Sequence, residues 1–316
     1  MRLKSAGIIA GVAVLGALFY AAPARLDAQG GVALSGVVSS DKEGKMEGVL
    51  VTARLDGANF DVTVVSDAQG KYSFPRTHLK GAGKATIKTR AVGFDLTSAN
   101  TVTVDAGKAA TLDLTLDKAK DLSKQLTSTE WLNSIAGTDE QKSMVQRQIE
   151  SCTYCHSMER IVKSRHNAEQ FIPVINRMFR YYPDGTMAGT EVPARGRAKF
   201  HEKESADMFE KMPSWGYAPG VKKPDLAAYL ATINMSGGKS LPTDLKTLPR
   251  PKGKATKVIV TQYDMPRKDT VPHDSDVDSK GNVWYTDQTD YFVGKFDAKA
   301  GTFQEWPLPK PAKHTV

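Results

Sequence analysis

The chain has 316 residues, enough for two domains or for three small ones. Its composition, 40% hydrophobic and 25% charged, is that of a folded globular protein and excludes a disordered or collagen-like chain. Lysine and arginine outnumber aspartate and glutamate by 43 to 35, and the two cysteines are too few for a scaffold held by several disulfides.

The first 28 residues have the pattern of a secretory signal peptide. Arg2 and Lys4 precede an apolar run over 6–22, and small-residue sites that a signal peptidase could read end at Ala24 and Ala28. An uncleaved membrane anchor is the alternative, because the apolar run is only slightly shorter than a membrane span. We expect cleavage after Ala28, export to a bacterial periplasm, and no membrane attachment of the mature chain.

Residues 31–118 alternate hydrophobic and polar side chains with a period of two. The clearest runs cover 49–54, 85–89, 101–104 and 111–116, and turns rich in aspartate and glycine separate them. Six or seven short strands at this spacing predict a β-sandwich.

The same segment resembles a carboxypeptidase regulatory-like domain. The likeness rests on Ser35-Gly36-Val37-Val38, Gly48-Val49-Leu50-Val51, the run from Ser66 to Phe74, and Val92-Gly93-Phe94. This resemblance implies a spacer or binding module beside another domain, with no chemistry of its own. We expect His78, on a loop of this segment, to be a surface residue.

From 121 to 236 the hydrophobic period changes to 3.6 residues. The pattern predicts helices over 140–151, 168–182 and 224–233, with Pro173 in the first turn of the second helix. We therefore expect a small all-α domain over 121–236.

This helical segment contains the sequence Cys152-Thr153-Tyr154-Cys155-His156. The pattern C-x-x-C-H is the signature of c-type haem attachment: two thiols add across the two haem vinyl groups, and the adjacent imidazole ligates the iron. A four-cysteine zinc site would need a second cysteine pair, and a thioredoxin-like site would need a βαβ context. We expect one covalent haem c, attached at Cys152 and Cys155, with His156 as the proximal ligand.

With this motif and a closing helix at 225–233, the segment resembles a class I c-type cytochrome. The resemblance implies a sixth iron ligand, usually methionine. We prefer Met212, which stands in a loop rich in proline and glycine before the closing helix. Met178, on the apolar face of the middle helix, is the alternative ligand. The further candidates are Met187, Met208 and His201.

Aromatic and basic residues near the motif are further candidates. The aromatic residues expected to pack on the haem, or to form ordinary core, are Phe171, Phe179, Trp215, Tyr217 and Tyr229. The basic residues that follow the motif are Arg160, Lys163 and Arg165. They could pair with haem propionates, dock an acidic redox partner, or form a solvated face.

Residues 237–256 read as a linker rich in proline and glycine. Between Lys239 and Lys257 there are six basic residues and a single acidic one. A charge run in a linker is usually solvated, and an exported protein does not meet nucleic acid. We therefore expect no nucleic-acid partner.

Over 257–316 the β pattern returns, with strands at 258–263, 282–286 and 291–296. The phrase Gln262-Tyr263-Asp264-Met265-Pro266 recurs 43 residues later as Glu305-Trp306-Pro307-Leu308-Pro309, an offset in the range of one propeller blade. Chance similarity in a small terminal sheet is the alternative. We expect a truncated β-propeller, about one blade of a longer array.

The segments Pro272-His273-Asp274, 278–284 and Thr286-Asp287 resemble a blade of the virginiamycin B (streptogramin) lyase family. That family carries out a metal-assisted elimination with residues in blades that this sequence lacks, so the resemblance implies the fold and not the activity. His273 is either a surface residue or a loop ligand.

The sequence thus predicts a multidomain chain: a β-sandwich, an all-α cytochrome c domain and a partial β-propeller. The expected function is that of a periplasmic monohaem c-type cytochrome that exchanges electrons with a redox partner protein. The alternative is a haem-linked propeller enzyme, either virginiamycin B lyase-like or an oxidoreductase. We assign no catalytic residue.

Overall fold

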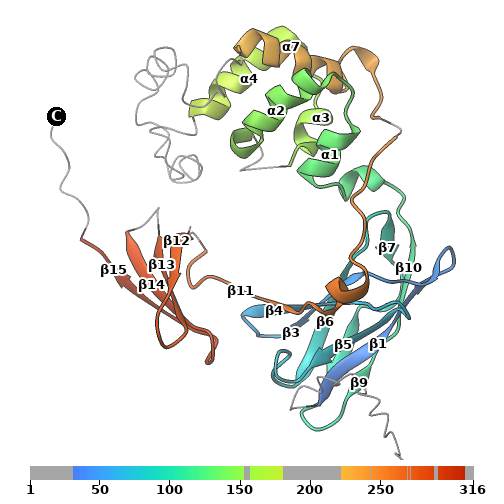
Figure 1. The fold of residues 1–316 in the computed structure, drawn as a ribbon, viewed down its shortest axis with the longest axis vertical. Helices are drawn as coiled ribbons and strands as arrows, with labels where there is room; N and C mark the ends of the chain where they lie inside the picture. Colours follow the sequence, from blue (N-terminus) through green and yellow to red (C-terminus); the bar gives the residue numbers. More distant parts are fainter. Residues whose placement is uncertain are drawn as a thin grey trace, which may run out of the picture.

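The computed structural model describes residues 31–152, 157–180, 222–242, 244–268, 270, 272–287 and 291–309. Within these ranges, the side chains of 146–152, 177–180 and 273 are not described. The strands form three sheets, and a cluster of short helices lies apart from the C-terminal sheet (Figure 1). The predicted signal peptide lies outside the described residues. None of the helices within the described ranges has the length and apolar character that a membrane crossing requires.

Two sheets form the sandwich. The first contains six strands, β1 (Val32–Ser40), β2 (Gly44–Lys45), β5 (Lys71–Pro75), β7 (Phe94–Leu96), β9 (Ala110–Thr111) and β10 (Leu114–Lys118). The second has the order β11-β4-β3-β6-β8, with β3 (Leu50–Leu55), β4 (Phe60–Val65), β6 (Gly83–Arg90), β8 (Thr101–Val104) and β11 (Val260–Tyr263).

The alternating sequence determines which side chains fill this sandwich. In β3, Val51, Ala53 and Leu55 are buried, whereas the residues between them are partly exposed. The long strand β1 pairs antiparallel with β5 and parallel with β9 and β10. Leu34 on β1 and Phe74 on β5 are fully buried in the shared core. The predicted β-sandwich is therefore present.

Strand β11 differs from the prediction. The sequence placed 258–263 in the C-terminal blade, but β11 pairs antiparallel with β4, in a register that sets Val260 opposite Thr63 and Tyr263 opposite Phe60. Just after β11, Asp264 forms an ion pair with Arg54 of β3. This pairing covers the β4 edge of the sandwich, whose backbone groups would otherwise be open. The strand itself was predicted from its residues, but its partner was not.

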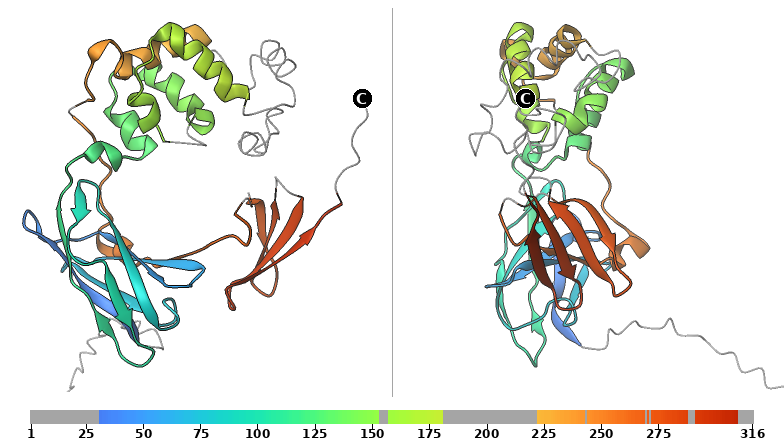
Figure 2. Two further views of the ribbon diagram at one scale, coloured as in Figure 1. Left: turned by 180° about the vertical axis from the view of Figure 1, so that it is seen from behind. Right: turned by 90° about the vertical axis from the view of Figure 1, so that its left-hand side faces the viewer.

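The C-terminal sheet is an antiparallel meander of β12 (Pro272–Val277), β13 (Asn282–Asp287), β14 (Phe292–Asp297) and β15 (Thr302–Pro307). The last residue of β11 and the segment that follows it pack on this sheet. The ring of Tyr263 lies 4.6 Å from that of Phe296, and Arg267 forms ion pairs with Asp287 and Glu305. The chain therefore runs from the sandwich directly onto this sheet (Figures 1 and 2).

The helices are α1 (Ser128–Ser134), α2 (Asp139–Cys152), α3 (Glu159–Val162), α4 (Ala168–Arg180) and α7 (Lys223–Ile233). Short 3-10 helices occur at Leu122–Lys124, Ser236–Gly238 and Gly253–Lys257. Helices α2, α4 and α7 lie where the period of 3.6 predicts helices. Pro224 is in the first turn of α7, where its missing N–H costs no hydrogen bond.

The predicted fold class is nevertheless wrong, because it required an all-α cytochrome c domain. The described chain is mostly β, with three sheets and only five α-helices, and it shows no such all-α domain. The core around the helices is not closed by helices alone. Val92 of the sandwich and Leu241 and Leu245 of the predicted linker pack against the same cluster. Periodicity identifies each helix but says nothing about which distant segments complete its core.

Candidate functional site

The C-x-x-C-H motif begins at the C-terminal end of α2. Cys152 is the last residue of that helix, and α3 begins at Glu159. The side chain of Cys152, and Cys155 and His156 entirely, lie outside the described residues. The predicted thiol attachment and iron ligation therefore stay predictions.

Most of the predicted distal ligands also lie outside the described residues. Met212 and Trp215 fall in the range 181–221, which is not described, and so do Met187, Met208, His201 and Tyr217. Met178 and Phe179 belong to α4, of which only the backbone is described at these positions. The choice between Met212 and Met178 is left open.

Two of the predicted haem-packing aromatics are described, and both belong to one buried cluster. Phe171 of α4 and Tyr229 of α7 are each 3% exposed. The hydroxyl of Tyr229 donates a hydrogen bond to the carbonyl oxygen of Ala136 at 2.8 Å, and burial raises the pKa of this phenol to about 12. Gly137 leaves room for the Tyr229 ring, since a Cβ there would lie 2.8 Å from it. Tyr229 is thus held in the cluster by burial and by one hydrogen bond.

The segment directly after the motif is attached to α1. Met158, two residues after His156, is fully buried in the same cluster. Its backbone N–H donates to the hydroxyl oxygen of Ser128, the first residue of α1, at 3.3 Å. One turn later on α1, Trp131 is fully buried, and its indole Nε1 has no hydrogen-bond partner among the described residues. Helix α1 therefore brings a buried, unpaired donor into the cluster that contains Met158.

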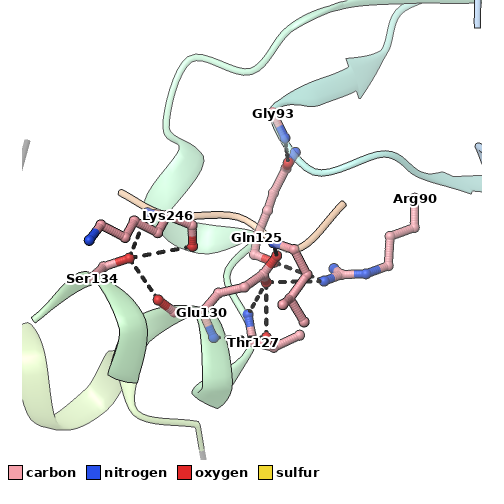
Figure 3. Close-up of polar contacts among 8 residues, drawn as sticks. Arg90, Gly93, Gln125, Thr127, Glu130, Ser134 and Lys246 are labelled. Carbon is pink, nitrogen blue, oxygen red and sulfur yellow. Dashed lines mark hydrogen bonds and ion pairs between the residues drawn. The ribbon is translucent and has the colours of Figure 1, made fainter. Parts of the chain in front are cut away.

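Glu130, beside Trp131, is a buried carboxylate at the junction of three segments (Figure 3). It completes a capping box with Thr127, whose backbone N–H donates to Oε2 at 2.8 Å, and it accepts from the backbone N–H of Leu248 at 2.8 Å. The Arg90 guanidinium, from the sandwich, lies 3.9 Å away. Burial by itself would raise the pKa of Glu130, but these donors outweigh burial and lower it. The carboxylate is held in its charged form.

Gln125 makes a second connection between the sandwich and the helices. Its side-chain oxygen accepts from the backbone N–H of Gly93 at 2.7 Å (Figure 3), and its side-chain nitrogen donates to the carbonyl oxygen of Phe94 at 2.9 Å. The Arg90 guanidinium also donates to the Gln125 carbonyl at 3.1 Å. These contacts fix the orientation of the chain as it enters α1.

Sequence reasoning missed Glu130 and Trp131 as residues of interest. A signal for the first was present, because Thr127-Ser128-Thr129-Glu130 has the capping-box spacing that marks the start of a helix. No comparable signal distinguishes a buried indole whose N–H is unpaired. That property depends on what surrounds the ring.

The basic residues that follow the motif divide into two kinds. Lys163 is partly buried and forms ion pairs with Glu159 at 2.6 Å and with Asp121 at 3.8 Å. Arg160 and Arg165 are exposed. Only the two arginines are therefore available at the surface to meet an acidic partner.

Two histidines outside the motif, His78 and His273, were also considered in the sequence. His78, which was expected to be a surface residue, lies in the turn after β5 and is only partly exposed. His273 lies in β12, but its side chain is not described. Within the described ranges no group of three or more histidine, cysteine or acidic side chains is arranged to hold a metal ion.

Comparison with known proteins identifies one part of the chain. Residues 33–117 match the carboxypeptidase regulatory-like domain family. A solved structure titled "The Bacillus anthracis TIE protein" is 18% identical, covers 27% of this chain and 16% of its own, and has a TM-score of 0.21. No curated protein matches the chain. The β-sandwich is therefore a carboxypeptidase regulatory-like domain.

Proposed function

We propose that this protein is an exported, monohaem electron-transfer protein. The observation that carries the proposal is the C-x-x-C-H sequence at 152–156, which contains both cysteines of the chain. We retain the resemblance to class I c-type cytochromes for this motif alone. The all-α fold of that family is not part of the proposal. The apolar N-terminal pattern over 6–22 supports export, because haem attachment and a periplasmic location go together.

The described residues suit a haem in two respects. Haem is a large apolar ring with two carboxylate groups, so it needs an apolar pocket and a few hydrogen-bond donors. The helical cluster supplies apolar and aromatic walls in Phe171, Tyr229 and Met158. It also contains the unpaired indole N–H of Trp131. Buried polar groups are almost always paired, so this donor calls for an acceptor.

In the proposed site each residue has a separate task. The thiols of Cys152 and Cys155 would hold the haem through thioether bonds to its two vinyl groups, each thiol proton going to the other vinyl carbon. His156 and either Met212 or Met178 would ligate the iron. When bound, the haem supplies an iron that gains and loses one electron. Phe171 and Tyr229 would exclude water, which limits reorganisation around the changing charge.

The test is to produce the full-length chain in a host with cytochrome c maturation machinery. We expect a red protein whose haem stays with the polypeptide on a denaturing gel. The double variant Cys152→Ala/Cys155→Ala should lose the stain completely, whereas His78→Ala, which changes a partly exposed histidine of the sandwich, should retain it. A colourless wild-type protein with two freely alkylated thiols would exclude the proposal.

The same preparation separates electron transfer from the alternative of a haem-linked enzyme, which the resemblance to virginiamycin B lyase-like blades suggested. A six-coordinate, low-spin spectrum that carbon monoxide does not change supports electron transfer. A sixth position that carbon monoxide occupies supports catalysis at the iron. Loss of the low-spin spectrum in Met212→Ala, but not in Met178→Ala, would support Met212 as the distal ligand.

A further inference from the structure

The segment 246–253, which the sequence predicted to be part of a solvated linker, is attached at both of its ends. We call this segment the strap. Its first half binds α1. The backbone N–H of Lys246 donates to the hydroxyl oxygen of Ser134 at 2.7 Å (Figure 3). The backbone N–H of Leu248 donates to the carboxylate of Glu130 at 2.8 Å.

The second half of the strap binds the loops on either side of β2. Arg250 forms an ion pair with Glu43, and the backbone N–H of Gly253 donates to the carboxylate of Glu47 at 2.9 Å. Two of the three carboxylates that hold the strap therefore belong to the sandwich, and the third, Glu130, belongs to α1. The strap thus connects the helical cluster with the sandwich (Figures 1 and 2).

The strap has little structure of its own. Residues 246–252 form neither helix nor strand, and no residue of the strap is buried. Leu248 is 49% exposed, and no strap side chain belongs to either hydrophobic core. A segment with few buried apolar contacts and accessible hydrogen bonds opens at a lower free energy than the cores beside it. The contacts that hold the strap are therefore the first that the two regions can give up.

We infer that the strap opens and closes as one unit while the sandwich and the helical cluster both stay folded. Closed, it braces α1 against the sandwich, in addition to the contacts that Arg90 and Gln125 make. Open, it releases the Glu130 carboxylate from Leu248 and exposes its own backbone to proteases. The inference does not rest on the proposed function, because it holds with or without a haem.

Gly48 offers a way to displace the strap without changing any residue in it. The φ angle of Gly48 is +79°, and a Cβ there would lie 2.2 Å from the carbonyl oxygen of Pro251. Gly48→Ala therefore strains the backbone and also pushes the strap away. Gly57 provides the matched control, because its φ is also +79° but a Cβ there would have no atom of this kind within 4 Å. The difference between the two variants measures the displacement of the strap.

The first test is limited digestion with trypsin under native conditions, with the cleavage sites identified by mass spectrometry. Cleavage after Lys252 should be at least about tenfold faster in Gly48→Ala than in Gly57→Ala, because cleavage of a locally open segment follows the population of the open state. Cleavage after Lys88 of β6 and after Lys142 of α2 should be the same in both variants. Equal rates after Lys252, or a parallel rise at Lys88 or Lys142, would overturn the inference.

The second test leaves Gly48 in place and decides the question if Gly48→Ala does not fold. Glu43→Gln/Glu47→Gln weakens both contacts of the strap with the sandwich. Hydrogen exchange of the amides in 246–253 should become several times faster, while β6 and α4 keep their protection. Asp56→Asn/Asp105→Asn is the control, because it makes the same change in net charge at exposed carboxylates in other loops of the sandwich. Exchange in the strap that matches this control, or lost protection in β6 or α4, contradicts the inference.

Discussion

The β-sandwich and the helical cluster differ in how they satisfy their buried polar groups. In the sandwich core, the buried hydroxyl of Ser66 donates to the carbonyl oxygen of Met46 at 2.7 Å and accepts from the N–H of Val49 at 2.9 Å, all within the same sandwich. In the helical cluster, Glu130 depends on Arg90 and Leu248, which lie outside the helices, and Trp131 has no described partner at all. The buried hydroxyl of Ser66 is thus paired within the sandwich, whereas Glu130 and Trp131 are not paired within the helices.

The largest expected effect tests whether the sandwich unfolds independently of the helical cluster. Phe74 is fully buried and packs edge-to-face on Tyr72 at 5.8 Å. Phe74→Ala should lower the free energy of unfolding of the sandwich by about 3–5 kcal/mol, because it removes buried area and leaves a cavity. Hydrogen exchange should show lost protection in β1 and β5 while α4 and α7 keep theirs. Equal loss in the helices would show that the two regions unfold as one.

The next effect tests whether the stability of the helical cluster depends on the contacts that Glu130 makes with segments outside the helices. Glu130→Gln keeps the shape of the side chain but removes the charge and one acceptor. We expect a loss of about 1–3 kcal/mol, because a Thr127 donor and the Arg90 guanidinium lose their partner. Urea unfolding followed by far-ultraviolet circular dichroism of the helices measures this loss. Glu159→Gln, in a partly exposed pair with Lys163, is the control and should cost no more than about 0.5 kcal/mol.

The stability difference between wild type and Glu130→Gln should depend on pH, and the direction of that dependence follows from the pKa of Glu130. The pKa of Glu130 is lowered in the folded state. Its stabilisation is therefore fully present above the unfolded pKa of about 4.3. It is lost as the pH falls through the lower folded pKa. The difference in unfolding free energy between wild type and Glu130→Gln should shrink as the pH is lowered below about 4. A difference that stays constant down to pH 2 would show that the charge does not contribute.

A smaller effect is expected from one hydrogen bond inside the helical cluster. Tyr229→Phe removes the hydroxyl that donates to the Ala136 carbonyl and keeps the ring against Gly137. The expected loss is about 0.5–1.5 kcal/mol, measured by thermal unfolding. If the ring also lines the haem, the Soret band should stay unchanged, since the apolar wall is retained. A loss above about 3 kcal/mol would mean that the hydroxyl supports more than this single bond.

The smallest effect concerns the strand added to the sandwich. Arg54→Met removes the ion pair with Asp264, which is more than half exposed, but keeps the aliphatic stem. We expect a change of about 0–1 kcal/mol. Hydrogen exchange of the β11 amides should rise only slightly, because their ladder with β4 remains. Complete loss of β11 protection would show that the ion pair, and not the ladder, holds the strand.

The candidate site could be predicted from the sequence only where its chemistry is local. The motif at 152–156 is readable because two thiols and an imidazole must stand close together in the chain to meet one haem. Helices α2, α4 and α7 are readable because each has its own 3.6-residue pattern. The distal ligand is not, since several methionines satisfy the same local rules. The role of Glu130 was missed because its partners Arg90 and Leu248 are 40 and 118 residues away.

By itself, the sequence determined the sandwich, helices α2, α4 and α7, and the C-x-x-C-H motif, because periodicity and short spacings act within a few residues. Only the tertiary structure decided that β11 completes the edge of the sandwich and that Val92 and Leu241 help to close the helical core, so that the described residues show no all-α domain. Pairing and burial depend on which segments meet in space. Strand β4 accepts β11 through backbone groups, and these are the same in every residue.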